Sequence, residues 1–245
     1  MNKQKKGFTL VELLVVIGIL GILMGALFPT ISSAMLNANT NAMAMRGRNL
    51  FVAITQVNVD REAAGLGSVW PQQDTEGLDQ DDATLVGAKS TVDYFKYLFD
   101  VENKGNAANW KPYVDCDIGV LSGGGVAGVS GTQITKQNVA WLIAQNVQSE
   151  MADVVPVLVS RNVQYTSLNT ALGSKVNGDE STEIQCGNGT GADDVPFGNK
   201  AWVMVRKGGA SQVIKAKVSK WSVVFNRTGF DNTQLENKPK FLELQ

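Results

Sequence analysis

The sequence predicts an α+β fold in which a long N-terminal membrane-spanning helix packs against a C-terminal antiparallel β-sheet. Three observations predict it. Residues 13–28 hold nothing more polar than glycine, and no charged side chain occurs between Glu12 and Arg46. Apolar residues then recur at helical spacing to about residue 60. The last third of the chain has short β-branched runs separated by turn signals, which are typical of strands.

The composition narrows the classes of function. The chain has 245 residues, which is enough for one or two domains with a sizeable core, and its 22 basic and 23 acidic side chains nearly balance. Near-neutral charge argues against nucleic-acid binding, which needs a concentrated basic surface. The absence of histidine excludes Ser-His-Asp and Cys-His nucleophile systems and histidine zinc sites. We therefore expect no enzyme, although carboxylate or lysine chemistry remains open.

The N-terminal apolar run has the length of a membrane span. From Phe8 to Phe28 there are 21 residues, and a helix of that length measures about 31 Å, close to the thickness of a bilayer's hydrocarbon core. Lys3, Lys5 and Lys6 precede the run and no basic residue follows it closely. The positive-inside rule therefore predicts a single membrane pass with a cytoplasmic N-terminus and the bulk of the chain on the other side of the membrane.

One acidic residue distinguishes the readings of this segment. A cleaved secretory signal with Ser32-Ser33-Ala34 as its small-residue site, a plain anchor and a specialised segment all fit the apolar run. Glu12, however, stands at the start of the run, where a lone carboxylate costs about 2–3 kcal/mol on insertion scales. Such a residue is a functional-site hypothesis by default, which favours the specialised segment.

The residues around Glu12 carry a resemblance. Lys5-Lys6-Gly7-Phe8-Thr9-Leu10-Val11-Glu12-Leu13-Leu14 closely resembles the N-terminal signature of type IV pilins and of the pseudopilins of type II secretion systems. The resemblance implies that a prepilin peptidase cuts after Gly7 and methylates the new N-terminus at Phe8. Residues 1–7 would then be a leader, and Glu12 the fifth residue of the mature chain. Pro29 lies where the family often has a helix-kinking proline.

Cleavage would give the buried carboxylate a partner. The cut after Gly7 creates a cationic amine at Phe8, and a carboxylate in lipid is tolerated when it is paired with such a charge. We hypothesise that Glu12 of one subunit neutralises the Phe8 amine of its neighbour and so sets the axial register of a growing filament.

Beyond the membrane half at 8–28, residues 29–60 predict an amphipathic half of the same helix. Two apolar stripes run along it. A helix from Phe8 to about Asp60 would be about 80 Å long, which suits a stalk packed first by sister helices and then by a head. Gly21 and Gly25 form a small-xxx-small pair that permits close helix approach, and the alternative, that glycine is simply common in membrane helices, is left open. The first stripe contains Ile31, Met35, Ala38, Ala42, Met45, Asn49 and Val52, and the second contains Leu50, Ile54 and Val57.

Residues 61–245 predict the head. Ser90 and Thr135 are expected to begin short helices, and Gly123-Gly124-Gly125 a surface loop rather than a phosphate loop. Pro156 indicates an edge strand or the start of a strand. We expect three or four antiparallel strands, with a frayed end after Asn226. The expected strands are 154–163, 201–206, 212–218 and 221–225, with Gly208-Gly209 as a hairpin turn.

Two further features of the head carry expectations. Cys116 and Cys186 are expected to form a disulfide, because oxidation prevails beyond the membrane, and two thiols are the alternative. Many major pseudopilins hold calcium near the C-terminus, and the oxygen-rich stretch that includes Asp193 and Asp194 has suitable ligand chemistry. Its spacing matches no known motif, so no cofactor is expected and calcium is only a candidate.

The resemblance implies a structural subunit of a type II secretion pseudopilus, anchored in the inner membrane with its head in the periplasm. Its expected partners are further copies in a filament, companion minor pseudopilins, the prepilin peptidase and the inner membrane, with no nucleic acid. The first alternative is a type IV pilus subunit for adhesion, motility or DNA uptake, located in an extracellular filament. The second is a membrane-tethered enzyme or binding module that uses the leader for delivery, with Asp81 and Asp82 or Asp193 and Asp194 as a carboxylate pair.

Overall fold

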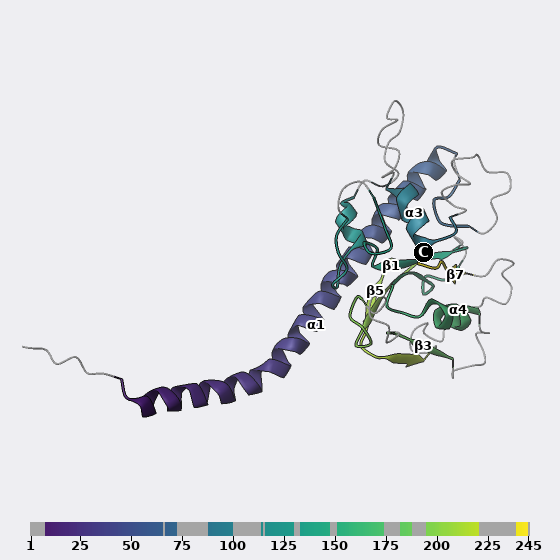
Figure 1. Ribbon diagram of the computed structural model, residues 1–245. Helices are drawn as coiled ribbons and strands as arrows, with labels where there is room; N and C mark the ends of the chain where they lie inside the picture. Colours follow the sequence, from purple (N-terminus) through teal and green to yellow (C-terminus); the bar gives the residue numbers. More distant parts are fainter. Residues whose placement is uncertain are drawn as a thin grey trace, which may run out of the picture. The chain divides into compact units, whose positions relative to one another are not determined.

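A computed structural model describes most of the chain (Figure 1). The long helix α1 runs from Leu10 to Ala63 and is followed by an antiparallel sheet, which confirms the predicted α+β class. Contacts divide the chain into two units, Met1–Asn39 and Thr40–Gln245, and each is considered by itself. The described residues are 8–65, 67–72, 88–99, 114, 116–129, 133–147, 151–173, 182–187, 195–220 and 239–244.

The first unit is the N-terminal part of α1. Its residues from Phe8 to Met35 are all exposed, in agreement with a segment that has no partner within its own chain. In the described part of the chain α1 is the one helix long and apolar enough to cross a membrane, by length and composition alone. Pro29 lies inside it, and the hydroxyls of Ser32 and Ser33 donate to backbone carbonyls four residues back.

The second unit is built on a five-stranded antiparallel sheet with the order β5-β4-β2-β1-β7. Every residue of β1 and β2 is buried, so both faces of these central strands are covered and their sequences show no polar alternation. A β-bulge near Val157 shifts the register between β2 and β4. The strands are β1 (Trp141–Gln145), β2 (Pro156–Ser160), β4 (Trp202–Arg206), β5 (Ser211–Ile214) and β7 (Lys240–Phe241).

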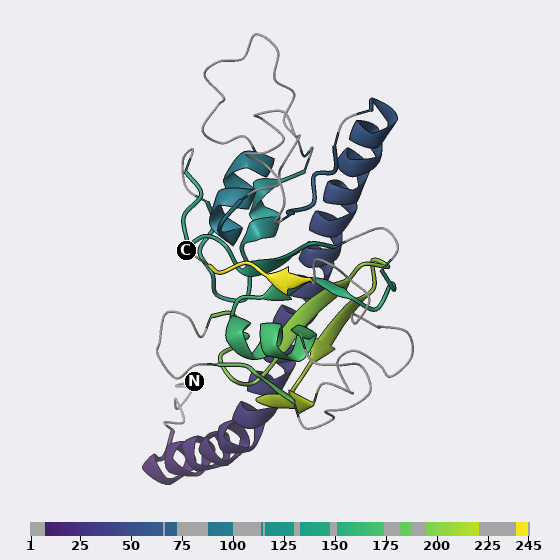
Figure 2. The ribbon, with the colours of Figure 1, turned by 90° about the vertical axis from the view of Figure 1, so that its right-hand side faces the viewer.

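The C-terminal half of α1 packs on this sheet, with the second of the two predicted stripes inward. Leu50 and Ile54 are completely buried. Gly47 makes the closest approach, because a Cβ atom placed there would lie 2.9 Å from Cζ2 of Trp141 and 2.9 Å from Cγ2 of Val205. Glycine at this position therefore lets the helix backbone come down onto β1 and β4. Figure 2 shows this blue part of α1 beside the sheet.

Smaller elements complete the unit. The helix α3 (Thr91–Leu98) begins where the sequence predicts, with the Ser90 hydroxyl accepting a hydrogen bond from the Asp93 amide, so this capping prediction is confirmed. The 3-10 helix η1 (Ile118–Leu121) is joined to β1 by the indole of Trp141, which donates to the Val120 carbonyl. The helix α4 (Tyr165–Gly173) lies beside a separate ribbon of β3 (Glu183–Gln185) and β6 (Val218–Lys220).

The C-terminal segment is held in the sheet, which corrects the expectation that the chain frays after Asn226. Strand β7 forms the sheet edge next to β1, and Leu242 after it is buried (Figure 2). The amide side chain of Asn169 bonds both the N–H and the C=O of Phe241, at 2.6 and 3.0 Å. These bonds satisfy the backbone groups of Phe241, although the short sequence Lys-Phe does not predict a paired strand. The expected strand at 221–225 lies outside the described residues.

Other expectations for the head need correction. Thr135 begins no helix: its hydroxyl bonds the Asn138 side chain in a turn, and the residues that follow form β1. The continuous apolar run there is buried on both faces, and such a run does not distinguish helix from strand by periodicity. Pro156 begins its strand as expected, but β2 is central rather than at the edge. The β4–β5 hairpin with its Gly208-Gly209 turn is confirmed.

The glycine run is packed rather than a free surface loop. A Cβ at Gly123 would lie 2.9 Å from Nη1 of Arg46, and one at Gly124 would contact Pro196 and Phe197. Gly124 also has a φ of +62°, a left-handed conformation that glycine adopts without strain. Arg46 itself donates a 2.8 Å hydrogen bond to the Ser122 carbonyl, which ties α1 to this turn.

Candidate functional site

The start of α1 is closed by a reciprocal hydrogen-bond box between Thr9 and Glu12. The Thr9 hydroxyl accepts a 3.3 Å bond from the Glu12 amide, and the Glu12 carboxylate accepts bonds from the Thr9 amide and hydroxyl at 2.9 and 2.8 Å. This is the Ser/Thr-x-x-Glu capping box, which satisfies two backbone donors that a helix start leaves without intrahelical partners. Glu12 is therefore held at the helix start by its own chain.

Both bonds to the carboxylate end on the same oxygen. Oε2 of Glu12 accepts from Thr9, whereas Oε1 has no hydrogen bond within the described residues. The side chain of Phe8, next to this box, is 77% exposed. Gly7, the expected last residue of the leader, lies outside the described residues. The geometry thus leaves one carboxylate oxygen and the aromatic side chain open to groups from outside the chain.

The expected packing residues of the membrane half lie on an open surface. A Cβ atom at Gly21 or Gly25 would meet no heavy atom within 4 Å, so neither glycine is needed for a contact inside the chain. Their packing role stays a prediction. Pro29 lacks the amide hydrogen that a helix interior uses, and it is the only proline that the structure places inside α1.

Beyond Thr40, the first of the two predicted stripes faces away from the sheet. Met45 and Val52 of this stripe are 69% and 55% exposed, on a helix whose other side is buried. Val59, which the predicted stripe did not include, continues it and is 54% exposed. The three are spaced by seven residues, so they share one face of α1. We call Met45, Val52 and Val59 the outer stripe. The sequence contains two apolar stripes, and their spacing alone does not indicate which one faces the head.

Cys116 and Cys186 are both thiols in the structure, and no disulfide joins them. Cys186 is buried, and its Sγ lies 3.0 Å from the Ala216 carbonyl oxygen, to which a thiol donates. Cys116 is partly buried ahead of η1. The disulfide stays a prediction about the oxidised protein, and a direct chemical measurement tests it.

The calcium candidates Asp193 and Asp194 lie outside the described residues, as do Asp81 and Asp82. Within the described residues, no group of three or more histidine, cysteine, aspartate or glutamate side chains could hold a metal ion. The geometry of the described residues therefore supports neither the calcium site nor the carboxylate pair of the tethered-enzyme alternative.

Sequence reasoning missed two residues that matter for the segment. Thr9 belongs to the capping box, and the spacing Thr-x-x-Glu before an apolar run was a readable signal for it. Gly47 decides which face of α1 meets the sheet, and no local signal distinguishes it from the other glycines of the helix, because its role depends on Trp141 and Val205 from distant strands.

Comparison with known proteins agrees with the resemblance at the N-terminus. The family model described as the prokaryotic N-terminal methylation motif matches residues 2–28. Neither the search of curated proteins nor the search of solved structures found a match. The motif implies processing by a prepilin peptidase, filament assembly and membrane anchoring. The chain therefore carries, on a long apolar helix followed by an antiparallel sheet, the N-terminal methylation signature of type IV pilin-like proteins.

Proposed function

We propose that this chain is a structural subunit of a type II secretion pseudopilus, which assembles through its N-terminal helix and takes part in protein export. The observation that carries the proposal is the methylation motif at residues 2–28, which includes the Thr9–Glu12 capping box at the start of α1. The motif supports a pilin-like subunit in general, and a type IV pilus subunit is the alternative that the experiment below separates. The proposal gives the head no catalytic role.

The open carboxylate oxygen supports assembly through Glu12. A methylated amine at Phe8 of a second subunit is a cationic donor, and Oε1 of Glu12 is an acceptor with no bond inside the described chain. In lipid the attraction between these charges is far less screened than in water. Oε2 meanwhile stays bonded to Thr9, so one carboxylate holds its own helix start and a neighbouring subunit together.

The outer stripe supports assembly beyond the membrane. Met45, Val52 and Val59 present apolar surface to solvent in the single chain, on the side of α1 opposite the sheet. Neighbouring copies of the same helix would cover this surface in a filament, as lipid and sister helices would cover the apolar residues from Phe8 to Phe28. Burial of exposed apolar surface favours association by about 25 cal/mol per Å².

The test deletes the gene and follows two processes in the same strain. If the chain is a pseudopilin, exported proteins accumulate in the periplasm, surface pili are unchanged, and the wild-type gene restores export. If surface pili are lost while export is normal, the chain is a pilus subunit and the secretion proposal fails. Filaments recovered from cells and built from this chain exclude an enzyme that uses the leader only for delivery.

A further inference from the structure

A cavity of about 420 Å³ lies in the head where the end of α1 meets the sheet. Small-molecule sites commonly have volumes of about 300–1,000 Å³ and combine apolar walls with a few polar groups. This cavity has that mixture. Its lining includes Phe51, Asn58, Glu62, Trp70, Val157 and Lys207.

The aromatic wall is fixed in place by hydrogen bonds. The rings of Phe51 and Trp70 pack with centroids 5.8 Å apart at an angle of 37°. Asn58 Oδ1 accepts from the Ser68 hydroxyl at 2.8 Å and from the Val69 amide at 3.0 Å, which holds the segment before Trp70 on the helix. The indole therefore has a defined position, and a ligand would not bear the cost of ordering it.

The α1 side of the cavity carries negative charge. Glu62 is exposed, and Oε1 of its carboxylate accepts a 2.7 Å hydrogen bond from Asn58 Nδ2. It lies in the last turn of α1, at the negative end of the helix dipole. A carboxylate at a helix C-terminus and two aromatic side chains around one space favour a cation with an apolar body.

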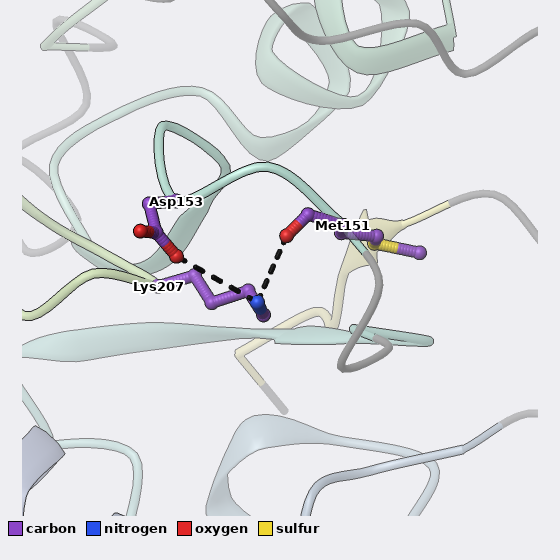
Figure 3. Close-up of polar contacts among 3 residues, drawn as sticks. All are labelled: Met151, Asp153 and Lys207. Carbon is purple, nitrogen blue, oxygen red and sulfur yellow. Dashed lines mark hydrogen bonds and ion pairs between the residues drawn. The ribbon is translucent and has the colours of Figure 1, made fainter.

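The one basic side chain in the lining, Lys207, already has partners within its own chain. Nζ of Lys207 donates a 2.8 Å hydrogen bond to the Met151 carbonyl and lies 3.7 Å from Oδ1 of Asp153 (Figure 3). The Asp153 carboxylate partly offsets the positive charge of Lys207. The lysine of the lining is therefore already paired with groups of its own chain.

We propose that this cavity binds an organic cation, either a quaternary ammonium or a guanidinium group, against Phe51 and Trp70 with Glu62 as counter-ion. The free cation could be a small molecule, or its charged group could be the basic side chain of another protein. The site lies in the head and is independent of the proposed role in secretion.

The experiment titrates the full-length chain in a non-ionic detergent, since detergents with choline head groups would compete for the site. Ligand-observed NMR would follow three probes: choline, a capped arginine, and the uncharged isostere of choline with a tert-butyl group in place of trimethylammonium. We expect saturable millimolar binding of a cationic probe and at least fivefold weaker binding of the uncharged isostere. Tighter binding of choline indicates a small-molecule ligand, and tighter binding of arginine a protein side chain.

Two variants locate the binding. Glu62→Gln should weaken the affinity for the cation about tenfold, and Trp70→Leu should weaken it several-fold. Asp60→Asn removes the same charge from the same exposed turn without lining the cavity, so it should change the affinity less than twofold. Absence of saturable binding, equal binding of the uncharged isostere, or equal effects of Glu62→Gln and Asp60→Asn would overturn the proposal. Because Glu62 is exposed, the decisive variant does not depend on a change in the core.

Discussion

Replacing Gly47 with alanine should destabilise the head, although alanine favours helices. A Cβ there would lie 2.9 Å from side-chain carbons of both Trp141 and Val205, closer than real Cβ atoms approach. The indole cannot swing away freely, because its N–H is bonded to the Val120 carbonyl. Overpacking in such a place costs about 3 kcal/mol, and the gain in helix propensity returns about 1 kcal/mol. The expected net loss is about 2 kcal/mol of unfolding free energy.

The assay is thermal unfolding of the full chain in detergent, followed by near-ultraviolet circular dichroism. For a unit of about this size, a loss of 2 kcal/mol lowers Tm by about 4–8 °C. Asn49→Ala is the matched control, because Asn49 is exposed on the same helix and the substitution changes propensity without adding a contact. A Gly47→Ala protein as stable as the Asn49→Ala protein would refute the close packing of α1 on β1 and β4.

Three further predictions concern the membrane segment, the core and the cysteines. Glu12→Leu should leave membrane insertion intact but sharply reduce the yield of sheared filaments. Thr9→Ala weakens only the helix cap, so this control variant should still assemble. Normal filament yield from Glu12→Leu would contradict the charge pairing. Tyr94→Phe should raise the unfolding free energy by about 1 kcal/mol, because the completely buried hydroxyl has no hydrogen-bond partner in the described structure. Burial also raises the pKa of this hydroxyl. A lower Tm of the variant would show that the hydroxyl has a hydrogen-bond partner after all. Intact-mass measurement after alkylation should show that Cys116 and Cys186 react only after reduction, because the compartment beyond the membrane is oxidising; two labels without reduction would disprove the bridge.

Predictions from local sequence patterns were correct where the structure of a segment depends only on its own residues. The apolar helix over residues 13–28 needs no distant residue, because no charged side chain occurs within that stretch. The cap at Ser90 and the Gly208-Gly209 hairpin also follow from neighbouring residues. The pattern failed at residues 139–145, where a run of apolar side chains fits a buried helix as well as a buried strand.

The C-terminus shows the other limit of local reasoning. Lys240–Phe241 is too short and too mixed to predict a strand, and its place in the sheet depends on β1 and on the amide of Asn169, both distant in sequence. The cavity of the head has the same origin, because Phe51, Trp70 and Lys207 are brought together by the packing of the helix end on the sheet.

The sequence by itself determined that the N-terminal region is a membrane-capable helix with a methylation signature, because that signature and the sorting of charge are properties of consecutive residues. The sequence also predicted two apolar stripes beyond Pro29, but it did not indicate which of them faces the sheet. Only the tertiary structure decided between these stripes. Gly47 lets the helix backbone reach Trp141 and Val205, so Leu50 and Ile54 are buried against the sheet and the outer stripe is left exposed for other molecules.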